Sequence, residues 1–269
     1  MFPMMSRTED AVKRFDWLSV AFLLGAALLC YYLLPLLSLV VSQPPGIVIQ
    51  RLTTPDVVSA ATTSTTASFT STALATLFGL PLAYWLARTD SGIQTLVTAL
   101  VVLPLVLPPI VSGMVLLTVV GPNTLLGELA AANGVPLTRS IVGVVLAQTF
   151  VASPFVVITA KAAFESVDRQ LEHASRSLGK SRLTTVRQVT LPIAWPGILA
   201  GVTLAFARAI GEFGATIMLA YYPRTMPVQI WVSFTTLGLD NAFPIAVILV
   251  GIAVATLVVL HVLGTNPLE

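Results

Sequence analysis

The feature that most constrains this chain is a set of six apolar runs, each more than 20 residues long. A helix needs about 20 apolar residues to cross a hydrocarbon core about 30 Å thick, so each run predicts one membrane span. The predicted spans are residues 17–41, 62–87, 95–120, 141–163, 194–220 and 242–263. The predicted fold class is therefore all-α, a polytopic membrane protein with about six transmembrane helices.

Composition supports a single membrane domain. Hydrophobic residues make up 56% of the 269 residues and charged residues only 10%, against roughly 25% charged residues in soluble domains. We predict an N-terminal cytoplasmic segment at 1–16 and one transmembrane domain at 17–264. A formal net charge of +2, without a basic stripe, argues against nucleic acid as a partner. Cys30 is the only cysteine, which excludes an internal disulfide.

The second predicted span differs from the others because its first half, residues 62–76, is rich in Ser and Thr. Hydroxyl groups in a membrane helix can bond back to their own helix or across to a neighbouring helix. We therefore expect this span to face protein or a polar cavity more than lipid.

Orientation follows from the Lys and Arg residues in the short loops, which are enriched on the cytoplasmic side. One side holds ten of them: Arg7, Lys13, Arg14, Arg88, Lys161, Arg169, Arg176, Lys180, Arg182 and Arg187. The other side holds three: Arg51, Arg139 and Arg224. This asymmetry predicts a cytoplasmic N-terminus, and an even number of spans then places the C-terminus in the cytoplasm too.

The longest polar connection, residues 161–192, lies on the predicted cytoplasmic side, between spans four and five. Apolar residues in its first half recur every three or four positions: Val167, Leu171, Ala174 and Leu178. They predict one short amphipathic helix that ends at Gly179. A second short helix follows from Ser181 as N-cap, with Leu183, Val186 and Val189 on one face, until Pro192 opens the next span.

The same connection carries a motif. The permease subunits of binding-protein-dependent ABC importers share the pattern Glu-Ala-Ala, three residues, Gly, nine residues, an aliphatic residue, any residue, Leu-Pro. This chain resembles that family at Ala174, Gly179, Val189, Leu191 and Pro192, with every spacing kept. His173 stands at the Glu position, directly after Glu172, and Ser175 replaces the second Ala.

The resemblance, which covers residues 62–264 as the core, implies the type I ABC importer permease fold. It also implies that residues 161–192, here called the coupling loop, dock into a groove on a cytoplasmic ATPase subunit. Two rigid short helices can transmit a movement of the ATPase to the membrane helices on either side, which a flexible chain could not do. The alternative is that the loop is only a solvated basic surface that satisfies the positive-inside rule.

ATP itself is not expected to bind this chain. Gly179-Lys180-Ser181 looks like the end of a phosphate-binding loop, but position 174 is Ala instead of Gly and no buried strand precedes it. The resemblance implies that ATP and Mg²⁺ bind on two copies of a separate ATPase subunit. It further implies a homodimer of this chain and an extracytoplasmic binding protein that selects the cargo.

The cargo is indicated by the fifth span and its continuation, residues 207–216, which read ARAIGEFGAT. This stretch, and the run of residues 103–109 that ends in Pro108-Pro109, are similar to the molybdate, tungstate and sulfate branch of the importers. Residues 221–223 and 242–244 are closest to its molybdate and tungstate members. The expected function is ATP-driven import of molybdate or tungstate, with sulfate or thiosulfate as the alternative.

Arg208 and Glu212 stand out independently of the resemblance. A charge in a membrane span costs roughly 2.5–3.5 kcal/mol on insertion scales, so both side chains should face protein or water. Their spacing of four residues puts them on one helix face. Two interpretations remain open: a pair that fixes helix packing or the switch between inward and outward states, or an Arg208 that lends positive potential to the path of a dianion. Pro108 and Pro109, which can break the third span, are further candidates for the path or the switch.

Other functional classes receive little support from the sequence. A secondary transporter or channel would be favoured by inverted repeats or acidic relays, but Glu212 is the only acidic residue in a predicted span. We expect no enzymatic activity in this chain, because no nucleophile motif is present. We expect no metal site, since His173 and His261 lack metal-ligand spacing.

Overall fold

The computed structural model describes the backbone of residues 6–264 and the side chains of residues 17–258. Residues 1–5 of the predicted N-terminal segment, and the predicted cytoplasmic C-terminus at 265–269, lie outside the described residues. The chain divides into two compact units, residues 1–49 and 50–269. Within residues 6–264 every regular element is a helix.

The first unit is formed by α1 (Ser6–Val41) and the beginning of α2 (Pro45–Leu52). From Trp17 to Val41, α1 has the length and apolarity of a membrane span. Residues 6–16, predicted as a separate segment, are the helical beginning of α1.

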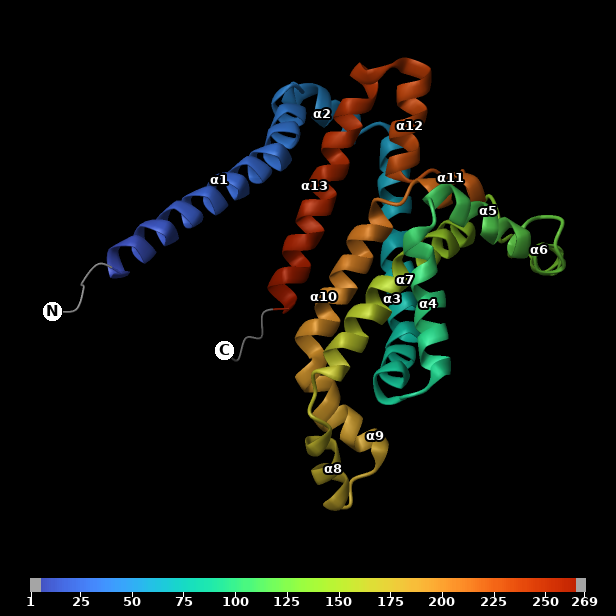
Figure 1. The fold of residues 1–269 in the computed structure, drawn as a ribbon. Coiled ribbons are helices and arrows are strands. Elements are labelled where there is room, and N and C mark those ends of the chain that lie inside the picture. The colour runs from blue at the N-terminus through green and yellow to red at the C-terminus, as the bar shows by residue number, and fades with distance from the viewer. Residues whose placement is uncertain (1–5, 265–269) are drawn as a thin grey trace. The chain divides into compact units, whose positions relative to one another are not determined.

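The second unit holds the remaining elements, which Figure 1 shows in chain order. They are α3 (Pro55–Arg88), α4 (Gly92–Val106), α5 (Pro109–Val120), α6 (Leu125–Ala132), α7 (Ile141–Glu165), α8 (Arg169–Ser177), α9 (Arg182–Thr185), the π-helix η1 (Val186–Thr190), α10 (Leu191–Ile210), α11 (Gly214–Leu219), α12 (Met226–Leu237) and α13 (Leu239–Gly264). Five helical stretches of the described chain can span a membrane, or six if α4 and α5 count as one broken span.

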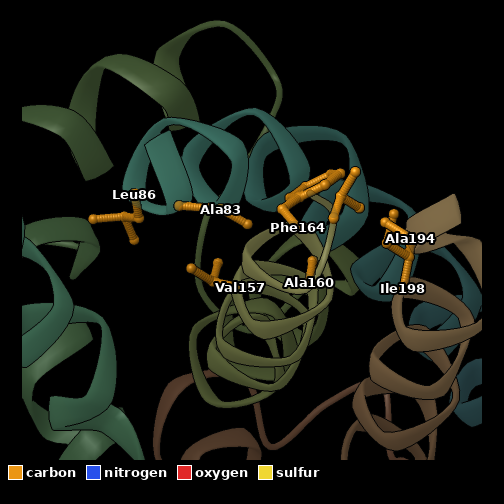
Figure 2. Close-up of a cluster of buried hydrophobic side chains, with 9 residues drawn as sticks. Ala83, Leu86, Val157, Ala160, Phe164, Ala194 and Ile198 are labelled. Carbon is orange, nitrogen blue, oxygen red and sulfur yellow. The ribbon is translucent and has the colours of Figure 1, made fainter. Parts of the chain in front are cut away.

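The centre of the second unit is the packing of α3, α7 and α10 on one another. Figure 2 shows how small and branched side chains meet there. The contributors are Ala83 and Leu86 of α3, Val157, Ala160 and Phe164 of α7, and Ala194 and Ile198 of α10. Small residues at these positions let the helix backbones approach closely, which is the usual basis of helix association in lipid.

Glycines bring α10 especially close to α7. A Cβ placed on Gly197 would lie 2.6 Å from the Cβ of Ala163, and one on Gly201 would lie 2.9 Å from the Cβ of Thr159. Both distances are shorter than carbon atoms tolerate. Gly197 and Gly201 are therefore the small residues of a close helix contact of the small-xxx-small type.

One face of the Ser- and Thr-rich half of α3 packs against protein, in partial agreement with the prediction, whereas Thr62, Thr66 and Thr70 are exposed. Ser64, Ser68 and Ser71 are fully buried. The Ser71 hydroxyl lies 3.2 Å from Oε1 of Gln148 on α7, and the Ser64 hydroxyl accepts a hydrogen bond from the backbone N–H of Met226. Other hydroxyls of α3 donate to the carbonyl four residues earlier, at Thr66, Thr70 and Thr76.

The third predicted span, residues 95–120, is not one helix. It consists of α4 and α5, which are bent by 118° at Pro108. The residue before a proline is pushed out of the helical region, and Leu107 and Pro108 both have extended backbones, with ψ of 135°. Proline is tolerated in the first turn of a helix, so α5 begins directly at Pro109.

The bent pair still carries the chain across the bundle. Helices α3 and α7 both end at the end of the bundle where α8 lies (Figure 1). The helical stretch that leads through α9 into α10 begins at this same end. Since α7 starts at the opposite end, the chain between Arg88 and Ile141 must pass from one end to the other.

The fifth predicted span, 194–220, is also interrupted. Helix α10 ends at Ile210, and α11 starts at Gly214. The helical stretch also begins earlier than the predicted residue 194. Residues 182–210 form one continuous helical stretch, with no break before Pro192. The missing N–H of Pro192 is accommodated by the π turn of η1, in which the N–H of Leu191 donates to the carbonyl of Val186, five residues earlier.

Candidate functional site

The coupling loop folds as two short helices with well-defined ends. Asp168 is the N-cap of α8, and its carboxylate accepts the backbone N–H of Gln170 at 2.8 Å. After α8, Gly179 adopts a positive φ of 82°, and its N–H donates to the carbonyl of Arg176 while that of Lys180 donates to Ser175. This pair of bonds is a Schellman motif, which ends the helix at the predicted glycine. Ser181 caps α9.

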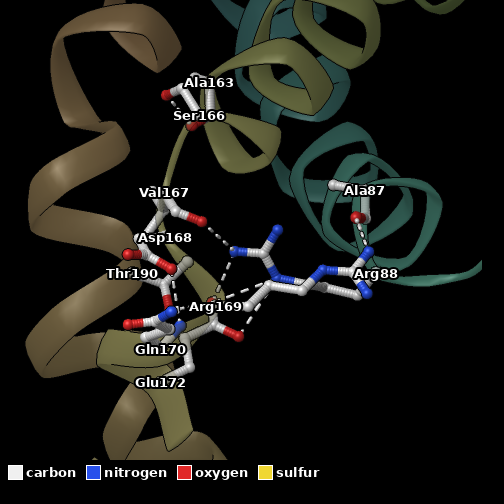
Figure 3. Close-up of polar contacts among 10 residues, drawn as sticks. All are labelled: Ala87, Arg88, Ala163, Ser166, Val167, Asp168, Arg169, Gln170, Glu172 and Thr190. Carbon is white, nitrogen blue, oxygen red and sulfur yellow. Dashed lines mark hydrogen bonds and ion pairs between the residues drawn. The ribbon is translucent and has the colours of Figure 1, made fainter. Parts of the chain in front are cut away.

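Glu172 connects this loop to the membrane helices. Figure 3 shows its carboxylate facing Arg88, the last residue of α3. Nη2 of Arg88 lies 2.7 Å from Oε1 of Glu172, and Nε lies 3.2 Å from each carboxylate oxygen. The hydroxyl of Thr190 in η1 donates to Oε1 at 2.7 Å. One carboxylate therefore holds α8, α3 and η1 together.

A second ion pair lies beside the first but is more exposed. Nη1 of Arg169 lies 3.4 Å from Oδ2 of Asp90, and Nη2 donates to the carbonyl of Ala87 at 3.4 Å. The two charged side chains are 51% and 81% exposed, and exposed pairs stabilise a fold by at most about 1 kcal/mol. The pair of Arg88 and Glu172, each 14% exposed, is the stronger connection.

The surroundings of Glu172 change its acidity. Burial by itself would raise the pKa of this carboxyl, but hydrogen bonds from Arg88 and Thr190, together with the charges of Arg88 and Arg169, outweigh it. The net effect holds the pKa of Glu172 below its ordinary value of 4.5, so the ionised form is favoured in the folded protein.

The other predicted docking residues have different environments. His173, Ala174, Gly179 and Pro192 are exposed, whereas Ser175, Val189 and Leu191 are partly buried. The Ser175 hydroxyl lies 3.0 Å from that of Thr185, which joins α8 to α9.

The apolar faces predicted for the loop are packed only in part. Val167 is buried in the central cluster, and Val186 and Val189 are partly buried. In contrast, Leu171, Leu178 and Leu183 are 47%, 82% and 70% exposed, so the chain itself leaves these three apolar side chains of the coupling loop uncovered.

Two residues of the Glu172 site were missed by sequence analysis. Arg88 is counted there only as a basic loop residue, and Thr190 occupies the position of the motif at which any residue is allowed. The available signal was the position of Arg88 as the one charge at the end of a long apolar run. Pairing with Glu172, 84 residues later, could not be seen from sequence.

The candidate path residues come together from two interrupted helices. A Cβ on Gly214, at the start of α11, would lie 2.7 Å from the Cβ of Pro109 and 2.9 Å from the backbone nitrogen of Ile110. One turn along α5, a Cβ on Gly113 would lie 2.8 Å from the carbonyl oxygen of Ala215. The break at Pro108 and Pro109 and the break after α10 thus lie in direct contact, an arrangement of broken helices typical of transporter interiors.

Glu212 lies in the second break and is 1% exposed. Its Oε1 accepts the backbone N–H of Ala215 at 2.7 Å, at the beginning of α11, and its Oε2 forms an ion pair with Nη2 of Arg208. Arg208, on the last turn of α10, keeps 26% of its side chain exposed. Glu212 therefore fixes both the start of α11 and the orientation of Arg208.

Among the residues that the structure describes, no group of three or more His, Cys, Asp or Glu residues could hold a metal ion. The side chain of His261 lies outside the residues described.

Comparison with known proteins places this architecture in a family. The model of the family described as "Binding-protein-dependent transport system inner membrane component" matches residues 75–265, which include both breaks and the whole coupling loop. The chain belongs to this family of permeases.

Two relatives cover nearly the whole permease. It is 59% identical over 267 residues to the probable molybdenum ABC transporter permease protein of Haloferax volcanii, with 98% of each chain covered. It is 39% identical over 253 residues to the molybdate/tungstate transport system permease protein of Pyrococcus furiosus, covering 93% of the permease and 96% of that protein.

A solved structure has the same fold. The permease matches a chain in the crystal structure of a bacterial ABC transporter for the acidic polysaccharide alginate, with a TM-score of 0.72 and 18% identity. The match covers 98% of the permease and all of the other chain. The chain is thus a multi-pass membrane protein with the fold of ABC importer permeases.

Proposed function

We propose that this permease is the membrane subunit of an ABC importer that moves molybdate or tungstate into the cell. The observation that carries this proposal is the 59% identity over 98% of the chain to a probable molybdenum permease. The chain lies in the cell membrane, with its N- and C-termini in the cytoplasm. The coupling loop then also faces the cytoplasm, where an ATPase can reach it.

The chain supplies no ATP site of its own. ATP and Mg²⁺ bind on two copies of an ATPase subunit, each of which docks on the coupling loop of one permease. The exposed leucines 171, 178 and 183 support this docking, because an apolar surface on an otherwise polar loop is typical of a protein interface. A loop that served only as a solvated basic surface would not be expected to expose these apolar side chains.

The anion crosses between two permeases related by a two-fold axis, after delivery by an extracytoplasmic binding protein. Arg208 supplies positive potential near the path, and Glu212 holds it in place from a fully buried position. A partly exposed guanidinium within a membrane protein is screened less than in water, and the carboxylate of Glu212 offsets only part of its positive charge toward the exposed side.

The runner-up cargo is sulfate or thiosulfate. Like molybdate and tungstate, they are tetrahedral dianions, so the permease would meet nearly the same charge and shape. The binding protein would then select between these anions. A channel or secondary transporter, which would work without ATP, is the alternative of another class.

Uptake into proteoliposomes tests the proposal. The permease is reconstituted with its ATPase, the anion-loaded binding protein is added outside, and ATP or a non-hydrolysable analogue is enclosed. We expect uptake of labelled molybdate only with ATP, reduced by unlabelled tungstate and unaffected by sulfate. Uptake with the analogue would indicate a channel or secondary transporter, and transport of sulfate alone would move the cargo to the runner-up.

A further inference from the structure

The carboxylate of Glu172 is turned toward its own chain instead of outward. Oε1 receives Nη2 of Arg88 and the hydroxyl of Thr190, both at 2.7 Å, and Oε2 receives Nε of Arg88 at 3.2 Å. Both oxygens are therefore occupied, and the side chain is 14% exposed. The neighbouring His173 and Ala174 are the residues of this turn that face outward.

Arg88 also lies over an aromatic ring. Its guanidinium carbon lies 5.8 Å from the centre of the Tyr84 ring, a distance at which a cation is attracted to the ring face. The Tyr84 ring in turn meets Phe164 of α7 edge to face, with 5.4 Å between ring centres. Phe164 is 2% exposed and belongs to the central cluster of α3, α7 and α10.

The contacts form a continuous path from the coupling loop to the membrane core. Glu172 is on α8, Arg88 ends α3, and Thr190 lies in the π turn that leads without interruption into α10. A charge-assisted, forked arginine–carboxylate pair fixes orientation as well as distance. These contacts join α8 to both α3 and the stretch that leads into α10.

We propose that Arg88, Glu172 and Thr190 form an internal clamp that makes α8 move as one rigid body with α3 and α10, so that Glu172 positions the coupling loop without contacting the ATPase. This inference rests on the proposed ATP-driven function. It assigns Glu172 a role different from the outward residues of the loop: those bind the partner, and Glu172 transmits the partner's movement.

The test compares E172Q with the wild-type permease in proteoliposomes, measuring ATPase binding, ATP hydrolysis and anion uptake in the same preparation. We expect E172Q to bind the ATPase normally and to hydrolyse ATP, while the number of anions moved per ATP falls by about 2- to 30-fold, the range over which substitutions along a coupled network change coupling. The matched control is D90N, which lies outside the coupling loop and removes only the exposed ion pair of Asp90 and Arg169; it should leave the ratio unchanged.

The double variant R88E/E172R restores a pair of opposite charges in reversed order. We expect it to recover at least part of the coupling ratio that E172Q loses, whereas R88E alone should not. Loss of ATPase binding in E172Q, with normal binding in D90N, would instead assign Glu172 to the docking surface and overturn the clamp.

A cross-link provides a measurement that does not depend on weakening the fold. In a C30S background, R88C and E172C are joined by a short bifunctional thiol reagent. If α3 and α8 move as one body, the link should take the place of the removed clamp and raise the number of anions moved per ATP toward the wild-type value, whereas the unjoined double-cysteine variant should stay as poorly coupled as E172Q. Transport abolished by the link would show that the two elements must separate during the cycle. Absence of transport by the wild-type protein itself would contradict the proposed function and not the clamp.

Discussion

Gly214 packs directly against Pro109, so closely that a Cβ on the glycine would lie 2.7 Å from the proline Cβ. The two residues open α11 and α5, and each follows a break in a membrane helix. At the break after α10, the freed backbone N–H of Ala215 is bonded by the carboxylate of Glu212. Such internal partners are what allows irregular backbone within a membrane protein.

The first prediction concerns this contact. G214A places a methyl group where Pro109 and the backbone of Ile110 leave no room, and overpacking of this kind typically costs about 1–3 kcal/mol. We expect a lower melting temperature in detergent and reduced uptake. The control is G211A, because a Cβ at Gly211 would have its nearest neighbour at 3.6 Å. Equal stability of the two variants would contradict the packing described.

The second prediction separates the roles of Arg208 and Glu212. R208Q removes the positive charge and should reduce uptake while leaving ATPase binding intact. E212Q keeps that charge and an acceptor for the N–H of Ala215, so it should retain more uptake than R208Q. The double variant R208Q/E212Q avoids an unpaired buried carboxylate, and full uptake by it would exclude a part for Arg208 in the path of the anion.

The third prediction concerns the exposed leucines of the coupling loop. Each of L178S and L183S removes an apolar side chain from the surface proposed to meet the ATPase, at a cost of roughly 1.5–3 kcal/mol if that side chain becomes buried in the complex. We expect weaker co-purification of the ATPase and an unchanged melting temperature of the permease alone. L129S on α6, where the leucine is 54% exposed, should have no effect on ATPase binding.

The fourth prediction follows from the acidity of Glu172. Its pKa is lower in the folded protein than its ordinary value of 4.5, because Arg88, Thr190 and Arg169 favour the ionised form. A lowered pKa contributes stability that is present above the ordinary value and is lost as the pH falls through the folded-state value. We expect the wild type to melt at a higher temperature than E172Q at neutral pH, with a difference that shrinks below about pH 4.5. A difference that stayed constant as the pH fell would contradict an ionic clamp.

Sequence analysis anticipated those parts of the fold that depend on local physics. Apolar run length located the spans, and Gly179 and Ser181 marked the ends of the two loop helices because a positive φ and a side-chain cap are local requirements. The bend at Pro108 was underestimated, since hydropathy continues across it without a change. The early end of α10 was missed because apolar residues continue on both sides of residues 211–213, so that the charge of Glu212 was interpreted as lying within one span.

Long-range partners were beyond reach of the sequence. Glu172 was grouped with the outward docking residues because it adjoins the motif, yet Arg88 and Thr190 set the direction of its side chain. Arg88 lies 84 residues earlier in the chain, and Thr190 occupies the motif position at which any residue is allowed. The grouping of Arg208 with Glu212 succeeded because four residues are one helical turn, even though α10 ends between them.

The measurement that tests the central claim most directly is ATP hydrolysis by the reconstituted permease and ATPase in the presence of binding protein loaded in turn with molybdate, tungstate and sulfate. The account predicts stimulation by the molybdate- and tungstate-loaded protein and none by the sulfate-loaded or empty protein. Failure of the ATPase to associate with the permease at all, or stimulation by sulfate alone, would contradict it.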